Sequence, residues 1–386
     1  MRADMKLVPC LSLAVAAMLL LCASAQRAMA DGANSFTQTN LVSDIPGMAK
    51  TTDPNLANPW GVSFSSGSPF WISDNKTGLA TLYDGAGDII PLVVTVPPPG
   101  AAPTGQVFNS SSSFNGDAFI FATEGGTITG WRGALGTTAE ILSNPGTGSV
   151  YKGLAIGTTP NGTYLYAADF HNNSITVLPG TGAPSLSGTF TDPNLPAGYA
   201  PFNIENIGGK LYVTYTVQDA AKHDDVSGPG HGIVDVFDLQ GNFLQRLISN
   251  GPLNSPWGMA IAPTGFGSFG NDLLVGNFGD GTINAFDPST GNFLGQLDGA
   301  DGKPIVNLGL WDLTFGNGGN AGSKSDLFFT AGIPGDGMVE DHGLFGSIVP
   351  TPEPGTFALL GIGLLVLVGT ARRREKCCDR LGWKPI

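Results

Sequence analysis

Cysteine is missing from the long middle part of this chain of 386 residues. The four cysteines lie close to the two ends, at Cys10, Cys22, Cys377 and Cys378. Residues 31–350 therefore form no disulfide, hold no metal through thiolates and use no thiol nucleophile. The stability of this segment must come from an ordinary buried core.

Basic side chains are scarce in the same segment. Residues 31–350 hold nine Lys or Arg against twenty-seven Asp or Glu, and the whole chain has a formal charge of −13. A field of this sign repels phosphate backbones, so we expect no nucleic-acid partner. Divalent cations, or colloidal solubility alone, fit this charge better.

Long helical periodicity is also absent between residues 31 and 350, whereas glycine (57) and proline (28) are abundant in the chain. The sequence contains no G-x-S-x-G nucleophile elbow, no P-loop and no H-E-x-x-H motif. What it does contain are short apolar runs between Gly, Asn and Asp clusters, which indicate strands.

Apolar segments mark the two ends of the chain. Arg2 and Lys6 precede an apolar run from Leu11 to Leu21, and Ala28-Met29-Ala30 is a small-residue cleavage site. This order predicts a signal peptide over residues 1–30 rather than an N-terminal core helix.

The second apolar segment, residues 355–371, carries no charge and ends at Arg372, Arg373 and Arg374. As a helix it reaches about 25 Å, a little less than the roughly 30 Å hydrocarbon core of a bilayer. The arginines favour the cytoplasmic side, which places residues 31–350 outside the inner membrane. We therefore expect a single transmembrane helix, followed by a cytoplasmic tail over 375–386.

The segment 351–374 resembles a known sorting signal. Pro352, Glu353 and Pro354, then the apolar segment, then the arginine cluster are similar to the PEP-CTERM signal of Gram-negative bacteria. The resemblance implies an exosortase-type membrane protease as partner, which acts near Pro-Glu-Pro and leads to surface display or release. Residues 375–386 depart from the family pattern, and a plain membrane anchor is the alternative.

A short phrase recurs six times between residues 50 and 350, at spacings of 44 to 55 residues. Its third residue is glycine in four repeats, Asn203 in the fourth and Asp312 in the sixth. Two further apolar runs follow each phrase, and a fourth run follows in five repeats. The phrases are PWGVSF (59–64), PTGQVF (103–108), YKGLAI (151–156), PFNIEN (201–206), PWGMAI (256–261) and LWDLTF (310–315).

The sixth repeat ends at Val349, one strand short, while the chain begins with a spare β-prone stretch at 35–42. A ring in which this N-terminal strand completes the last repeat leaves no long exposed edge. We therefore predict an all-β fold, a six-bladed β-propeller over residues 31–350 that strand 36–42 closes. Repeat five, SPWGMAIAPTG and the strands after it, resembles NHL-type repeats, which implies this fold and says little about function.

Aromatic side chains dominate the second position of the phrases and the loops after the second strands. In a propeller blade these positions share one face. Packing between blades is the role we favour for the tryptophans, and stacking on flat ligands such as the sugar rings of an extracellular polysaccharide is the functional alternative. The candidate ligand-binding residues are Trp60, Phe202, Trp257, Trp311, Phe170 and His171.

Two loops on the same predicted face, residues 217–232 and 332–343, are longer than the others and combine acids with histidine. Their carboxylates suit Ca²⁺, and their histidines would suit a transition metal. Solvated turns are the alternative. The candidate metal ligands are His223, Asp224, Asp225, Glu340 and Asp341.

Similar propellers include metal-dependent lactonases, and that resemblance implies a Ca²⁺-type ion in the central channel. Only Asn203, Glu205 and Asp312 offer oxygen near the six phrases, which weakens the enzyme interpretation. We favour an exported binding module without catalytic residues. A lactonase-like hydrolase is the first alternative, and a structural matrix component is the second.

Overall fold

The computed structural model describes residues 35–146, 148–335 and 339–351. Within them, Phe36–Val349 form one compact unit. The expected signal peptide (1–30), the apolar segment 355–371 and the tail 375–386 lie outside the described residues. Among the residues that are described, no helix is long and apolar enough to cross a membrane.

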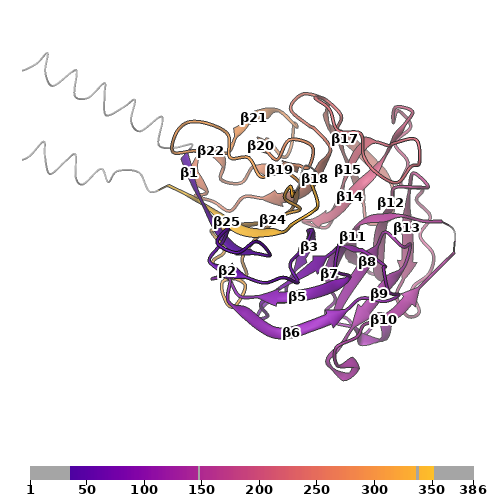
Figure 1. Ribbon diagram of the computed structural model, residues 1–386. Coiled ribbons are helices and arrows are strands. Elements are labelled where there is room, and N and C mark those ends of the chain that lie inside the picture. The colour runs from indigo at the N-terminus through magenta and orange to yellow at the C-terminus, as the bar shows by residue number, and fades with distance from the viewer. Residues whose placement is uncertain (1–34, 147, 336–338, 352–386) are drawn as a thin grey trace, which may run out of the picture. The chain divides into compact units, whose positions relative to one another are not determined.

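Six antiparallel sheets are arranged around a central axis, and they form the predicted six-bladed propeller (Figure 1). The innermost strand of each sheet carries the recurring phrase. Contacts join these six strands into a closed ring, each strand to the next and the last to the first. In ring order the inner strands are β3 (Pro59–Ser63), β7 (Pro103–Phe108), β11 (Tyr151–Thr159), β14 (Tyr199–Ile207), β18 (Pro256–Ile261) and β23 (Leu310–Phe315).

Outside each inner strand, the apolar runs pair in sequence order as antiparallel neighbours. Blade one adds β4 (Phe70–Asp74), β5 (Leu79–Tyr83) and β6 (Ile89–Thr95), and blade two adds β8 (Phe119–Thr123), β9 (Ile128–Trp131) and β10 (Glu140–Ser143). Blade four adds β15 (Lys210–Val217), β16 (Ile233–Asp238) and β17 (Phe243–Ser249), and blade five adds β19 (Leu273–Asn277), β20 (Ile283–Phe286) and β21 (Phe293–Gln296).

The glycine of the phrase has a steric cause. A Cβ added at Gly105 would lie 2.3 Å from the backbone nitrogen of Leu154, and one at Gly258 would lie 2.5 Å from the carbonyl oxygen of Trp311. The register of every inner strand against its neighbour also shifts at the phrase. Such bulges redirect side chains, so the residue before the glycine position turns toward the channel.

The N-terminal strand closes the ring, as predicted. Strand β1 (Ser35–Ser43) pairs with β25 (Leu344–Pro350), which follows β24 (Leu327–Ala331) and β23 in blade six. The Ser43 hydroxyl donates a hydrogen bond of 2.7 Å to the Gly343 carbonyl. Chain segments about three hundred residues apart therefore complete one sheet (Figure 1).

Blade three corrects the expectation of four strands in every repeat. In the described part of the chain it has only β11, β12 (Gly162–Asp169) and β13 (Ser174–Pro179). Residues 180–198 run instead toward blade four, where the Gly188 and Phe190 amides donate to the β16–β17 turn at 3.1 and 3.0 Å. Prolines in this segment lack an N–H for a ladder, which explains why no strand forms.

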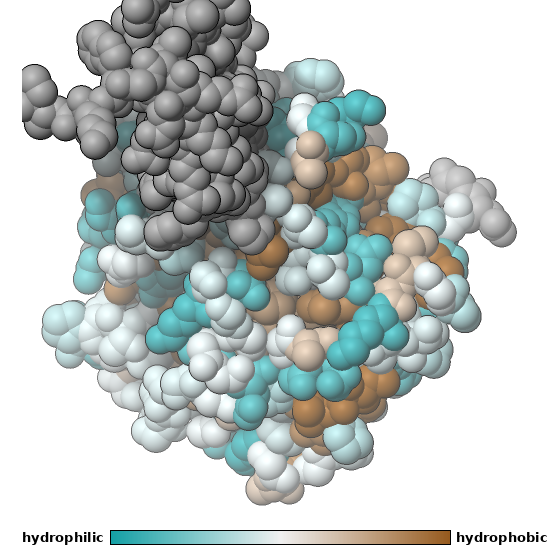
Figure 2. Space-filling model, turned by 90° about the vertical axis from the view of Figure 1, so that its left-hand side faces the viewer, coloured by the Kyte–Doolittle hydropathy of each residue, from teal (hydrophilic) through white to brown (hydrophobic). Residues whose placement is uncertain are grey.

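Apolar side chains pack mainly between neighbouring blades. Phe36 of β1 is 2% exposed and lies 5.0 Å from Phe266 and 6.1 Å from Phe269, measured between ring centroids. On the face shown in Figure 2, apolar side chains reach the surface as separate patches among polar ones. Such scattered exposure is normal for a globular domain.

Replacing Phe36 by Ala should destabilise the propeller by about 3–5 kcal/mol, because a buried ring of the closing strand is lost. The melting temperature, followed by circular dichroism, should fall by on the order of 10 °C. Ile89→Ala on the outer strand β6 is the control, because that side chain is 46% exposed. An unchanged melting temperature for Phe36→Ala would show that β1 does not hold the ring closed.

Candidate functional site

The aromatic residues of the phrases form a plug across one end of the channel. Trp60 and Trp311 stack with their ring centroids 3.5 Å apart, and Phe278 stacks on Trp311 at 4.2 Å. Trp257 meets Trp311 edge-on at 5.8 Å. The plug, as defined here, consists of Trp60, Phe170, Ala200, Phe202, Trp257, Phe278 and Trp311.

The rings of this plug pack against one another and are not exposed as stacking faces. Trp60, Phe202, Trp257 and Trp311 are each 1% exposed, and Phe170 is fully buried. A sugar ring needs an open aromatic face, and these rings present their faces to one another. His171 is half-buried beside the plug. That these residues bind a ligand stays a prediction, but the open platform on which it depended is not formed by them.

Lys152 lies on the plug with its charge balanced by acids. Its side chain is almost fully buried, and Nζ lies 5.2 Å from the centroid of the Trp60 ring. The ammonium pairs with Glu124 and, at 3.4 Å, with Asp224. Burial lowers the pKa of Lys152, but Glu124, Asp224 and Glu340 more than offset this and hold the pKa above its usual value. Lys152 therefore stays charged and is not a nucleophile.

Both long loops reach the same end of the channel as the plug. This confirms the prediction that the long loops and the second positions of the phrases share one face of the propeller. Asp224 of the first loop contacts Lys152, and Glu340 of the second accepts a hydrogen bond of 3.0 Å from Asn58. Burial raises the pKa of Glu340 to about 7.

The five candidate metal ligands do not share one site. His223 lies 2.8 Å from Asp224, and these two approach Glu124 closely enough to hold an ion together. Asp225, however, accepts hydrogen bonds from Ser227 and Ser255, and Asp341 pairs with Lys76 at 3.1 Å. The five residues therefore do not form a single cluster, and the Lys152 ammonium supplies positive charge beside Glu124 and Asp224. That some of these residues bind a metal stays a prediction.

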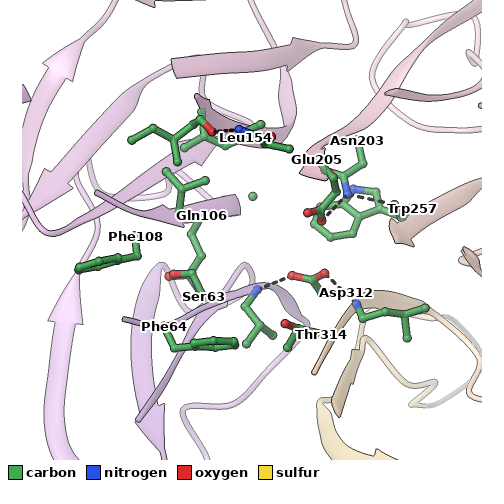
Figure 3. A pocket seen from close by; sticks show the side chains of 17 residues that line it. Ser63, Phe64, Gln106, Phe108, Leu154, Asn203, Glu205, Trp257, Asp312 and Thr314 are labelled. Carbon is green, nitrogen blue, oxygen red and sulfur yellow. Dashed lines mark hydrogen bonds between the residues drawn. The ribbon is translucent and has the colours of Figure 1, made fainter. Parts of the chain in front are cut away.

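A cavity of about 420 Å³ lies in the channel, and Trp257 of the plug is part of its wall (Figure 3). Its lining comes from the inner strands of all six blades. The lining mixes apolar and aromatic side chains with polar ones, and the polar side chains include Gln106, Asn203, Glu205 and Asp312.

Two carboxylates face this cavity. Asp312 is 5% exposed, and its oxygens accept hydrogen bonds from the backbone amides of Val62 at 2.6 Å and Leu313 at 2.8 Å. Glu205 is half-buried and has the Asn203 amide at 3.4 Å as its hydrogen-bond donor. Asn203 also donates to the Trp257 carbonyl at 3.0 Å, which ties the acid to the plug.

Burial and mutual repulsion keep protons on this acid pair. Burial raises the pKa of Asp312 to about 7, although the two backbone amides act in the opposite direction. Burial and then the charge of Asp312 raise the pKa of Glu205 well above its usual value. At neutral pH the pair therefore does not carry two full negative charges, because like charges close together disfavour ionisation.

Gln106 is the cavity residue that sequence reasoning missed. It is 6% exposed, and its amide nitrogen donates to the carbonyls of Gly61 and Trp71, each at 2.6 Å. The sequence signal for the rest of the site was the departure from glycine at the third position of the phrase. Asn203 and Asp312 are the two departures, and both line the cavity.

Replacing Lys152 by Met should cost about 3–5 kcal/mol of stability, because Glu124 loses its cation in a largely buried setting. Urea denaturation at pH 7 measures this. Lys50→Met, which removes an exposed pair with Asp88, should change the stability by about 0–1 kcal/mol. Equal stabilities for the two variants would contradict the role given to Lys152.

Replacing Glu205 by Gln should stabilise the protein at pH 8 by about 1–2 kcal/mol and change little at pH 4. In the folded state the acid pair holds protons that the unfolded chain releases near pH 4. The free-energy cost of burying the pair therefore grows as the pH rises toward the pKa of Asp312, about 7. Urea denaturation at both pH values tests this. The same pH slope in wild type and variant would mean that folding does not raise the pKa of Glu205.

Comparison with known sequences adds a sorting signal and relatives. Residues 350–374 match the PEP-CTERM protein-sorting motif, which implies export and processing by an exosortase at the membrane. The chain is 34% identical over 329 residues to "Uncharacterized protein R648" of Acanthamoeba polyphaga mimivirus, covering 80% of this chain and 78% of that protein. It is 33% identical over 332 residues to "Uncharacterized protein L690" of the same virus, covering 80% and 84%.

Among solved structures, a "Streptogramin B lyase structure" aligns with a TM-score of 0.49 and 12% sequence identity, over 83% of this chain and 99% of that chain. At this level of similarity no function is transferred. The sequence relatives decide the classification: this chain belongs to the same protein family as the two uncharacterized mimivirus proteins, and it carries a PEP-CTERM motif.

Proposed function

We propose that this protein is an exported binding module and that its ligand occupies the channel cavity. The observation that carries the proposal is the cavity itself. Its volume of about 420 Å³ lies within the roughly 300–1,000 Å³ range of small-molecule sites. Such sites combine apolar walls with polar groups that orient the ligand, and this cavity contains side chains of both kinds.

The open mouth of the cavity supports a ligand that approaches from the end opposite the plug. The lining residues Phe64, Phe108 and Thr314 lie at or just beyond the ends of their inner strands and are half-buried, and Asn206 is exposed. The plug closes the other end. A small molecule fits this arrangement better than the extended polysaccharide chain that exposed tryptophans would have favoured.

Replacing Thr314 by Phe should block the cavity from its open end. Thermal-shift measurements with a small-molecule library should give stabilising ligands for the wild type, and the variant should lose at least tenfold in affinity for each. Thr264→Phe, on an exposed loop, is the matched control. A pull-down with polysaccharides is carried out in parallel. If Thr314→Phe leaves ligand affinity unchanged, or if the protein binds polymers only, the ligand-binding site lies outside the cavity.

A second candidate function, a metal-dependent hydrolase of the lactonase kind, is supported by one observation. Asn203, Glu205 and Asp312 line one cavity, and oxygen ligands of this type suit hard cations such as Ca²⁺. Elemental analysis of the purified protein, followed by a lactone hydrolysis assay with and without chelator, tests it. A metal-free protein without activity in added Ca²⁺ would remove this candidate.

The sorting motif supports a route for display. In this proposal the apolar segment 355–371 anchors the chain temporarily, the propeller lies outside the inner membrane, and cleavage occurs near Pro352-Glu353-Pro354.

Replacing Pro352, Glu353 and Pro354 by alanines should leave membrane insertion intact and prevent cleavage, because the apolar segment and the arginine cluster are unchanged. Fractionation and mass spectrometry of the C-terminus in the native host should show a longer, membrane-retained product. Mature wild-type protein that still ends at Ile386 would mean that the segment is a plain anchor.

A further inference from the structure

The acid pair in the cavity has no cationic partner. Among the described residues that line the cavity there is no Lys, Arg or His. Glu205 and Asp312 come from strands β14 and β23, which lie on the two sides of β18 and Trp257. Figure 3 shows both carboxylates on one side of the cavity and Gln106 on the other. The cavity therefore presents two carboxyl groups without a cation beside them, and a cationic ligand would supply it.

The third polar group is also unsatisfied. The amide nitrogen of Gln106 makes two hydrogen bonds, whereas its Oε1 is buried and has no hydrogen-bond partner within the described residues. A buried acceptor without a donor costs stability, and a ligand with N–H groups would relieve this cost. The cavity thus contains three acceptor groups and lacks a charged donor among its lining residues.

The remaining lining argues for an organic ligand rather than a bare ion. Phe64, Phe108, Leu154 and Trp257 contribute apolar surface to a space of about 420 Å³. Ca²⁺ takes 6–8 oxygen ligands at roughly 2.3–2.6 Å, and both oxygens of Asp312 already accept backbone N–H bonds. Aromatic and aliphatic walls contribute nothing to such a shell.

We propose that the cavity binds an organic amine in its protonated form, with the ammonium between Glu205 and Asp312 and the apolar body against Phe64, Phe108 and Trp257. A primary ammonium has three N–H donors, and the two carboxylates on this side of the cavity are acceptors for them. The indole of Trp257 adds a favourable surface for a cation. This assignment rests on the proposed function, namely that the cavity is the binding site.

Binding of the ammonium displaces protons from the acid pair. The empty pair retains protons near neutral pH because burial raises the pKa of Asp312 to about 7 and that of Glu205 well above its usual value. No other titratable side chain lines the cavity in the described part of the chain. An incoming positive charge favours the ionised carboxylates, so complex formation near pH 7 releases protons to the buffer.

The test compares amines with alcohols of the same carbon skeleton by isothermal titration calorimetry on the full chain. The probes are benzylamine, 2-phenylethylamine and 3-phenylpropylamine, each against its alcohol, with CaCl₂ as a separate titrant. We expect at least one amine to bind tenfold or more tightly than its alcohol at pH 7. Its apparent enthalpy should differ between phosphate and Tris buffers, since protons are released.

Variants separate this inference from the proposed function. Glu205→Gln keeps the shape of the side chain and should reduce amine affinity at least tenfold while leaving the alcohols unchanged. Asp219→Asn, at an acid that does not line the cavity, should change neither. Thr314→Phe should abolish both kinds of binding.

The outcomes are distinguishable. If amines and alcohols bind equally and Thr314→Phe abolishes both, the cavity is the site and the ammonium assignment is overturned. If no amine binds more tightly than its alcohol and CaCl₂ binds in a Glu205-dependent manner, the site is one for a divalent cation. If binding of every probe is insensitive to Thr314→Phe, both the assignment and the proposed function fail.

Discussion

The backbones of neighbouring inner strands approach one another so closely at the channel axis that most phrases have no room for a side chain at their third position. A Cβ at Gly105 would fall 2.3 Å from a neighbouring backbone nitrogen, and one at Gly61 would fall 2.7 Å from a carbonyl oxygen. The bulge that accompanies each glycine turns the preceding side chain into the channel. The aromatic plug, the position of Lys152 beside it and the channel cavity all follow from this packing of backbone against backbone.

Charge is distributed unevenly inside this frame. Arg132 pairs with the buried Asp117, and Arg246 pairs with the buried Asp192. Lys152 is likewise neutralised by carboxylates. With so few basic side chains in an acidic domain, the cavity acids are the buried pair that line a hollow without a cation in its wall. Acids without a cation where solvent or a ligand can enter are typical of a binding site, whereas the compensated pairs are structural.

Local sequence was sufficient for most of the architecture. The alternation of apolar runs with Gly and Asn clusters, and the missing last strand opposite a spare first one, predicted six blades and their closure by residues 36–42. It failed in blade three, where the prolines of residues 180–198 exclude a ladder and the backbone bonds to the next blade instead. It also left open whether the tryptophans pack or form an open platform, because periodicity shows which residues point toward the channel but not whether several rings fill it.

The candidate site divides along the same line. The sequence by itself determined that residues 203 and 312 break the glycine rule, that acids dominate the domain, and that a sorting tail follows it, since these depend on residue type and spacing alone. Only the tertiary structure decided that Lys152 pairs with Asp224 of the candidate metal ligands and that Glu205, Asp312 and Gln106 line one cavity. These residues come from blades four, six and two, and the distance between side chains on separate blades is set by ring closure, which no local pattern records.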